Sequence, residues 1–142
     1  MRITESDFSN KIVKRSSKKI GDIFFFNHIA VIEFYDGVHV DINNSKEIFE
    51  EITSYFGYNK PFGVISNRIN SYSIKLLDVH LFRNKVKNLR AYGVVGHNRA
   101  SKISAKIESD YCLSKKVDYD SIYEAVDSVY RKVKKEIQVS LN

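Results

Sequence analysis

The sequence contains few of the residues that stabilise small secreted proteins or bind metals. Its 142 residues include one cysteine, one proline and no tryptophan. A single cysteine, Cys112, excludes an internal disulfide bond, and its neighbours Tyr111 and Leu113 predict a buried thiol in a strand. The four histidines have no metal-ligand spacing, and no P-loop, dinucleotide fingerprint or nucleophile elbow occurs. The sequence therefore assigns no catalytic residue, metal or cofactor.

Long apolar runs are also missing. No stretch of 18 apolar residues occurs, and residues 1–5 lack the apolar segment of a secretory signal. We therefore expect no membrane span and, since disulfides are excluded, a reducing, cytoplasmic location.

The charge is moderately basic and lies mostly at the two ends of the chain. The net charge is +6, of which the first twenty residues carry +4 from six basic and two acidic residues, and a second basic cluster covers residues 131–135. With no tryptophan and no basic–aromatic motif, this excess indicates a solvated surface rather than a specific nucleic-acid site. We expect residues 1–20 to be a basic, partly ordered extension and residues 21–142 to be one domain.

The pattern of apolar residues predicts alternating strands and helices. Strands are predicted over 21–26, 29–35, 62–65, 89–96 and 112–117, and helices over 45–56, 74–84, 100–111 and 121–137. The order β-β-α-β-α-β-α-β-α predicts an α/β fold with a mixed, mostly parallel sheet of about five strands and four helices. The short break at Asn27–His28 indicates an antiparallel hairpin between the first two strands.

Helix ends and buried faces are predicted from local spacing. Asn44 with Glu47, and Ser121 with Glu124, have the capping-box spacing, and Gly57 is typical of a helix end. The third helix has apolar residues at helical spacing, which we expect to face the core: Ala100, Ile103, Ile107 and Tyr111.

The segment 60–73 holds most of the candidate functional side chains. Its apolar part, 62–65, predicts a strand, and the polar residues after it predict a turn that opens a helix capped by Ser71 or Ser73. A helix N-terminus after a strand attracts anions, and an exposed Arg68 would add a positive charge. Turn formation and capping alone are the structural alternative. The candidate binding residues are Asn67, Arg68, Asn70, Ser71, Tyr72, Ser73 and His97.

His97 belongs to this set because it follows the next predicted strand. Adjacent parallel strands end at the same edge of a sheet, so Asn67 and Arg68 should lie near His97 and Asn98.

The segment Lys60-Pro61-Phe62-Gly63-Val64-Ile65-Ser66-Asn67-Arg68-Ile69-Asn70-Ser71-Tyr72-Ser73, with the predicted element order, resembles a group of small bacterial STAS-like proteins related to anti-sigma-factor antagonists. The resemblance covers about 21–129. It implies a signalling module that acts through protein contacts, with a phosphorylated serine at Ser71 or Ser73. In place of the family's Asp-Ser-Ser-Gly, this chain has Asn70-Ser71-Tyr72-Ser73.

Two functions are therefore expected. The first is a non-catalytic interaction or regulatory module with a protein partner, in which Arg68 and Tyr72 are exposed contact residues. The alternative is a binder, or weak enzyme, of a small anionic ligand at the loops Ser66–Ser73 and His97–Asn98. The sequence also allows a homodimer through an exposed apolar sheet face.

Overall fold

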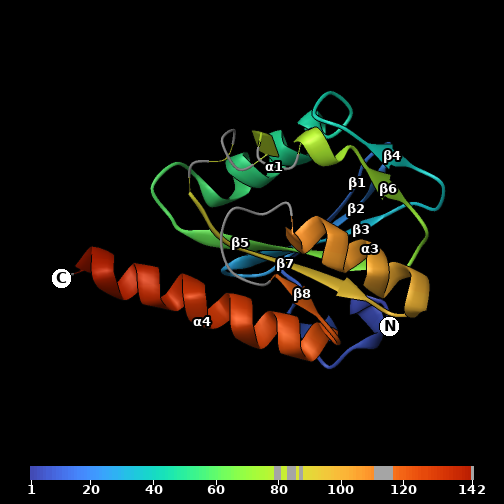
Figure 1. Cartoon of the computed structure of the whole chain (residues 1–142). Helices are drawn as coiled ribbons and strands as arrows, with labels where there is room; N and C mark the ends of the chain where they lie inside the picture. The colour runs from blue at the N-terminus through green and yellow to red at the C-terminus, as the bar shows by residue number, and fades with distance from the viewer. Residues whose placement is uncertain (79–80, 83–85, 87, 111–116, 142) are drawn as a thin grey trace.

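The computed structural model describes residues 1–78, 81–82, 86, 88–110 and 117–141 (Figure 1). The strands are β1 (Lys14–Ser17), β2 (Gly21–Phe25), β3 (Ile29–Phe34), β4 (His39–Val40), β5 (Phe62–Arg68), β6 (Ser73–Ile74), β7 (Leu89–Gly96) and β8 (Asp118–Tyr119). The α-helices are α1 (Lys46–Phe56), α3 (Arg99–Asp110) and α4 (Ile122–Leu141). Three short 3-10 helices are η1 (Ile3–Glu5), η2 (Ser9–Lys11) and η3 (Leu76–Asp78).

The main sheet is mixed and mostly parallel, as predicted. Its six strands have the order β1-β2-β3-β5-β7-β8, and β4 pairs with β6 in a separate parallel pair. β1–β2 and β2–β3 are antiparallel, whereas the remaining neighbours of the main sheet are parallel. The predicted hairpin is confirmed, and Phe26 N–H donates to Ile29 O at 2.8 Å to close it.

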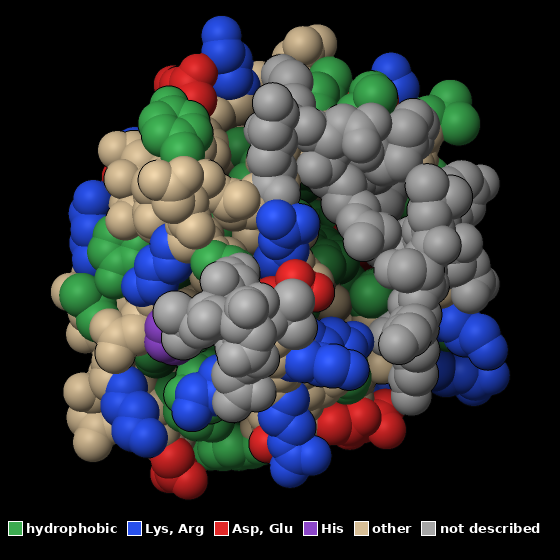
Figure 2. All heavy atoms as spheres, turned by 90° about the vertical axis from the view of Figure 1, so that its left-hand side faces the viewer, with side chains coloured by type: hydrophobic (Ala, Val, Ile, Leu, Met, Phe, Trp, Pro, Cys, Tyr) green, Lys and Arg blue, Asp and Glu red, His purple; other side chains and the backbone are tan. Residues whose placement is uncertain are grey.

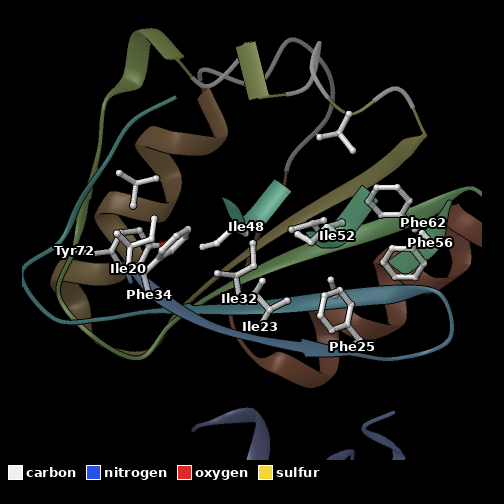
Figure 3. Packing of buried hydrophobic residues seen from close by; sticks show 14 residues of the cluster. Ile20, Ile23, Phe25, Ile32, Phe34, Ile48, Ile52, Phe56, Phe62 and Tyr72 are labelled. Carbon is white, nitrogen blue, oxygen red and sulfur yellow. The ribbon is translucent and has the colours of Figure 1, made fainter. Parts of the chain in front are cut away.

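The sheet is covered on both faces. α1 and α3 lie on one face and α4 on the other (Figure 1). The alternating side chains of β3 and β5 supply both cores, because neighbouring residues of a strand point to opposite faces. Figure 3 shows the core under α1, where Phe25, Phe56 and Phe62 form an aromatic group. The central strands β3 and β5 are thus buried on both sides, and the homodimer that the sequence allows stays a prediction.

Residues 1–20 do not form a separate extension. β1 pairs with β2, and Ile3 is fully buried under α4 with Val31 and Ala125. This segment therefore accounts for the sixth strand, which the sequence did not predict.

The helix predicted over 74–84 is wrong at its start. Ile74 belongs to β6, which pairs with β4, and Leu76–Asp78 forms η3. Leu81 and Phe82 are helical, while 79–80 and 83–84 lie outside the described residues. Backbone pairing of β6 with β4 overrides the local helical pattern here.

Of the three helix ends predicted from the sequence, two are confirmed by the structure. Gly57 ends α1 with a φ of 80°, and Ser121 Oγ accepts the N–H of Glu124 at 3.1 Å at the start of α4. The predicted Asn44–Glu47 capping box is wrong, because Ser45 precedes α1 and Asn44 Oδ1 instead accepts the N–H of Asp41 at 2.9 Å.

The predicted strand over 112–117 lies outside the described residues except for Val117, and so does Cys112. β8 begins directly after it, at Asp118. None of the helices in the described part of the chain has the length and hydropathy needed to cross a bilayer.

Candidate functional site

Ser66, Asn67 and Arg68 continue β5 instead of turning away from the sheet. They lie opposite Val94, Val95 and Gly96 of β7 in a parallel register. The strand sends Ser66 and Arg68 to the side of α3 and Asn67 to the opposite side, where the N-terminal segment packs. The predicted turn is therefore wrong, and the same polar residues contribute to two separate buried clusters.

The first cluster is centred on a buried ion pair between Arg68 and Glu108 of α3. Arg68 Nη1 lies 3.4 Å from Glu108 Oε2, and Arg68 Nη2 donates to the carbonyl of Tyr72 at 2.6 Å. The guanidinium also lies 3.9 Å from the centre of the Tyr72 ring, a cation–π contact. Tyr92 donates its hydroxyl to Glu108 Oε1 at 2.5 Å, and Ser66 and Tyr72 share a hydrogen bond between hydroxyls.

These contacts correct the expectation that Arg68 and Tyr72 are exposed. Arg68 is 5% exposed and Tyr72 6% exposed. Burial raises the pKa of Glu108 above its ordinary value, and the contacts with Tyr92 and Arg68 oppose that rise. Burial also raises the pKa of the Tyr72 hydroxyl, so this group stays protonated. Arg68 Nε has no hydrogen-bond partner within the described part of the chain.

The second cluster lies on the other face of the sheet and is centred on Glu33 of β3. Glu33 Oε2 accepts the backbone N–H of Ile3 and the side-chain amide of Asn67, each at 2.8 Å. Asn67 also donates to the carbonyl of Met1 at 3.0 Å, and its Oδ1 lies 2.5 Å from His97 Nε2. The cluster thus ties the first residues of the chain to the carboxyl ends of β3, β5 and β7.

The titratable groups of this cluster are perturbed in opposite directions. Burial raises the pKa of Glu33, while the hydrogen bonds from Ile3 and Asn67 oppose the rise. Burial lowers the pKa of His97, and nearby positive charges add to that effect. Both shifts favour the neutral forms, as expected for groups removed from water.

The predicted proximity of Asn67 and His97 is confirmed, and it follows from the parallel pairing of β5 and β7. Arg68 lies on the opposite face from this pair. Asn98 instead starts α3, where its side-chain oxygen accepts the N–H of Ser101 at 2.8 Å.

The loop between β5 and β6 has contacts of its own. Asn70 donates its side-chain amide to the carbonyl of Phe34 at 3.0 Å, and the N–H of Ser71 donates to Asp36 Oδ1 at 2.9 Å. Ser73 lies in β6, where its hydroxyl is 2.7 Å from His39 Nδ1. Ser71 and Ser73 are exposed.

The two physical reasons for expecting a stabilised phosphoserine are absent from this arrangement. Ser71 and Ser73 do not cap a helix, since β6 occupies this segment, and Arg68 is paired with Glu108. Phosphorylation at Ser71 or Ser73 therefore stays a prediction that rests on the family resemblance.

Sequence reasoning missed Glu33 and Glu108, the acidic centres of the two clusters. Glu33 could have been found, because it is the one charged residue in the apolar strand 29–34. Glu108 carries no comparable signal, since an acidic residue in a helix is usually exposed. Within the described residues, no group of three His, Cys, Asp or Glu side chains is placed to hold a metal ion.

α3 faces the sheet with a different side from the one predicted. Ala105 and Glu108 are buried, whereas Ile103 is 54% and Ile107 43% exposed. At 3.6 residues per turn, the two isoleucines lie roughly opposite the buried pair. The ion pair with Arg68 fixes this orientation, because burying the isoleucines instead would turn Glu108 away from its partner.

The exposed side of α3 therefore carries an apolar stripe, and its basic neighbours Arg99, Lys102 and Lys106 are exposed as well. We call Arg99, Lys102, Ile103, Lys106 and Ile107 the α3 surface.

Comparisons with protein-family models, with curated proteins and with solved structures gave no match.

Proposed function

We propose that this chain is a STAS-like, non-catalytic interaction or regulatory module, and that it binds a protein partner through the α3 surface. The observation that supports this most strongly is the exposure of Ile103 and Ile107, four residues apart on one helix. Apolar side chains at this spacing can anchor a partner that buries them.

The charges of the α3 surface indicate what kind of partner fits. Arg99, Lys102 and Lys106 flank the two isoleucines, and only Lys102 has an acidic neighbour in the described structure, Asp120, at 3.9 Å. A partner with an apolar groove bordered by acidic side chains would complement both features. Asn67 and Arg68 hold the fold together in this proposal, because their contacts are internal.

The proposal can be tested by comparing two double variants for binding. Ile103→Ser with Ile107→Ser removes the apolar stripe, whereas Val13→Ser with Tyr58→Ser removes two apolar residues elsewhere that are at least as exposed. Proteins crosslinked to the wild-type chain in native cell extract would be identified by mass spectrometry and their affinities measured with purified components. Because both isoleucines would be buried at the interface, we expect the α3 variant to lose about 30-fold or more in affinity.

The control variant should bind within about twofold of the wild type, since surface changes away from an interface have small effects. A partner that binds the α3 variant and the wild type equally well would disprove the assignment of the surface.

The second candidate function is a binder, or weak enzyme, of a small anion at the carboxyl ends of β5 and β7. The favouring observation is the pairing of Asn67 with the half-buried His97 at that edge. Thermal denaturation with a set of anionic metabolites tests this function, because a ligand present at a hundred times its Kd stabilises the folded protein by about 2.7 kcal/mol. A stabilising ligand whose effect is lost in His97→Ala would favour this function, and no shift across the set would count against it.

A further inference from the structure

A cavity of about 360 Å³ lies beside the first half of β7. β8 pairs only with Val94 and Val95, so among the described strands nothing pairs with the outer edge of residues 89–92. The cavity is lined by residues from this edge, from α1 and from α4. Figure 2 shows hydrophobic side chains in a hollow on this side of the molecule, with basic and acidic side chains along part of its border.

The interior of the cavity is mainly apolar. Val64, Ile74 and Phe82 contribute to its lining, and its volume lies in the range of sites for small molecules, about 300–1,000 Å³. Its inner polar groups already bond to protein: Tyr92 donates to Glu108, and Ser66 bonds to Tyr72. An apolar molecule could therefore enter without breaking these hydrogen bonds.

The remaining lining is charged and predominantly basic. Arg90, Lys132 and Lys135 contribute three positive charges against two negative charges from Glu108 and Glu136, and Glu108 is already paired with Arg68. Lys132 donates to the hydroxyl of Tyr119 at 3.3 Å, a neutral partner, and Lys135 is exposed on α4. An anionic group at this side of the cavity would meet an excess of positive charge.

We propose that this cavity binds a small amphipathic carboxylate, such as a medium-chain fatty acid. The alkyl chain packs among Val64, Ile74 and Phe82, and the carboxylate faces Lys132 and Lys135 of α4. The site is independent of the α3 surface and of the Asn67–His97 pair, so the inference goes beyond both functions proposed above.

The affinity of the purified full chain for three probes tests the charge requirement. Decanoate, 1-decanol and decyltrimethylammonium share an alkyl chain and differ in the head group; each would be titrated by calorimetry below its micelle concentration. We expect saturable one-to-one binding of decanoate, weaker binding of decanol and the weakest binding of the cation. Equal binding of all three, or no saturable binding of decanoate, would overturn the proposal.

Two variants of α4 locate the carboxylate. Lys132→Gln with Lys135→Gln removes two charges that line the cavity, whereas Arg131→Gln with Lys134→Gln removes two from the same helix outside it. Since a partly exposed ion pair contributes about 0.2–1 kcal/mol, we expect the first variant to bind decanoate about two- to thirtyfold more weakly and to bind decanol unchanged. Equal effects of the two variants would overturn the assignment.

A third variant locates the alkyl chain. Ile74→Trp adds volume at a half-buried position of the lining and should abolish binding of both decanoate and decanol. Its circular dichroism and melting curve would be compared with those of the wild type. Decanoate binding at wild-type affinity in a folded Ile74→Trp protein would contradict the proposed site, and the two lysine variants decide the matter if Ile74→Trp does not fold.

Discussion

The ion pair between Arg68 and Glu108 shows how a single contact can determine which residues are exposed. Both side chains are buried, and Glu108 lies on the side of α3 that faces the sheet. Taking two charges out of water costs several kcal/mol each, so each charge depends strongly on its partner. Ile103 and Ile107 are exposed as a consequence of this pairing.

Removing one partner of this pair should destabilise the protein more than replacing both. We expect Glu108→Leu and Arg68→Met each to lower the free energy of unfolding by about 3–5 kcal/mol, because each leaves a buried charge unpaired. The double variant should recover most of this loss. Urea denaturation of all four proteins measures the cycle, and losses in the double variant equal to the sum of the single losses would contradict the prediction.

The second acidic centre makes stability depend on pH. Burial raises the pKa of Glu33 in the folded chain, so the folded state binds a proton more tightly than the unfolded state does. This stabilisation is complete below the unfolded pKa of about 4.3 and is lost as the pH rises through the folded pKa. In the wild type, Glu33 should therefore make the free energy of unfolding decline as the pH rises from about 4. We expect this decline to be smaller in Glu33→Gln.

Chemical denaturation at several pH values measures that slope. Glu47→Gln, at an exposed position of α1, is the matched control and should leave the slope unchanged. His97 contributes with the opposite sign, because its lowered pKa removes stability as the pH falls below about 6.5. A slope in Glu33→Gln identical to that of the wild type would show that Glu33 does not titrate in this range.

At the scale of elements, the close approach of β7 and α3 depends on Gly96. A Cβ atom at this position would lie 2.6 Å from the backbone nitrogen of Lys102, which is too close for any stable contact. At Gly93, an added Cβ would meet the Val129 side chain at 3.2 Å, a contact that a small rotation can relieve.

We therefore expect Gly96→Ala to be the more damaging of two matched substitutions in β7. Gly96→Ala should lower the free energy of unfolding by about 1–3 kcal/mol, because the backbone of α3 must move away from the strand. Gly93→Ala should cost less. Thermal and urea unfolding compare them directly, and equal losses would show that α3 is not held at the distance seen here.

The segment after β5 shows where element prediction reaches its limit. The spacing of Ile74, Leu77 and Leu81 is typical of a helix, yet Ile74 is in β6 and Leu77 is exposed in η3. The pairing of β6 with β4 involves residues more than thirty positions apart, so no local pattern contains it.

At the scale of the whole molecule, the N-terminal segment is part of the folded unit. Ile3 is fully buried, and its N–H is bound by Glu33. We expect Ile3→Ala to lower the free energy of unfolding by about 2–5 kcal/mol, since it leaves a cavity between β3 and α4. Val13→Ala, at an exposed position, should change it by no more than about 0.5 kcal/mol.

Urea denaturation provides both values. A loss for Ile3→Ala as small as that for Val13→Ala would mean that the first residues do not contribute to the core, and the six-stranded unit would then begin at β1.

The sequence by itself determined the class of fold and the sheet that forms its centre. Apolar strands of four to eight residues alternate with amphipathic helices, and this periodicity depends only on local backbone geometry. The same reasoning predicted the hairpin at Asn27–His28, the cap at Ser121 and the proximity of Asn67 to His97.

Only the tertiary structure decided which polar side chains are buried. Asn67, Arg68 and Tyr72 were expected at the surface because polar residues avoid the core when they lack partners. The partners of Asn67 and Arg68, which are Glu33, Met1 and Glu108, are 34 to 66 residues away in the chain, so the contacts that offset the burial of these two side chains are visible only after the strands and helices have assembled. Tyr72 is buried with them through its contacts with Ser66 and Arg68. The chemistry of a side chain sets the free energy that its burial costs, and contacts with residues distant in the chain decide whether that free energy is offset.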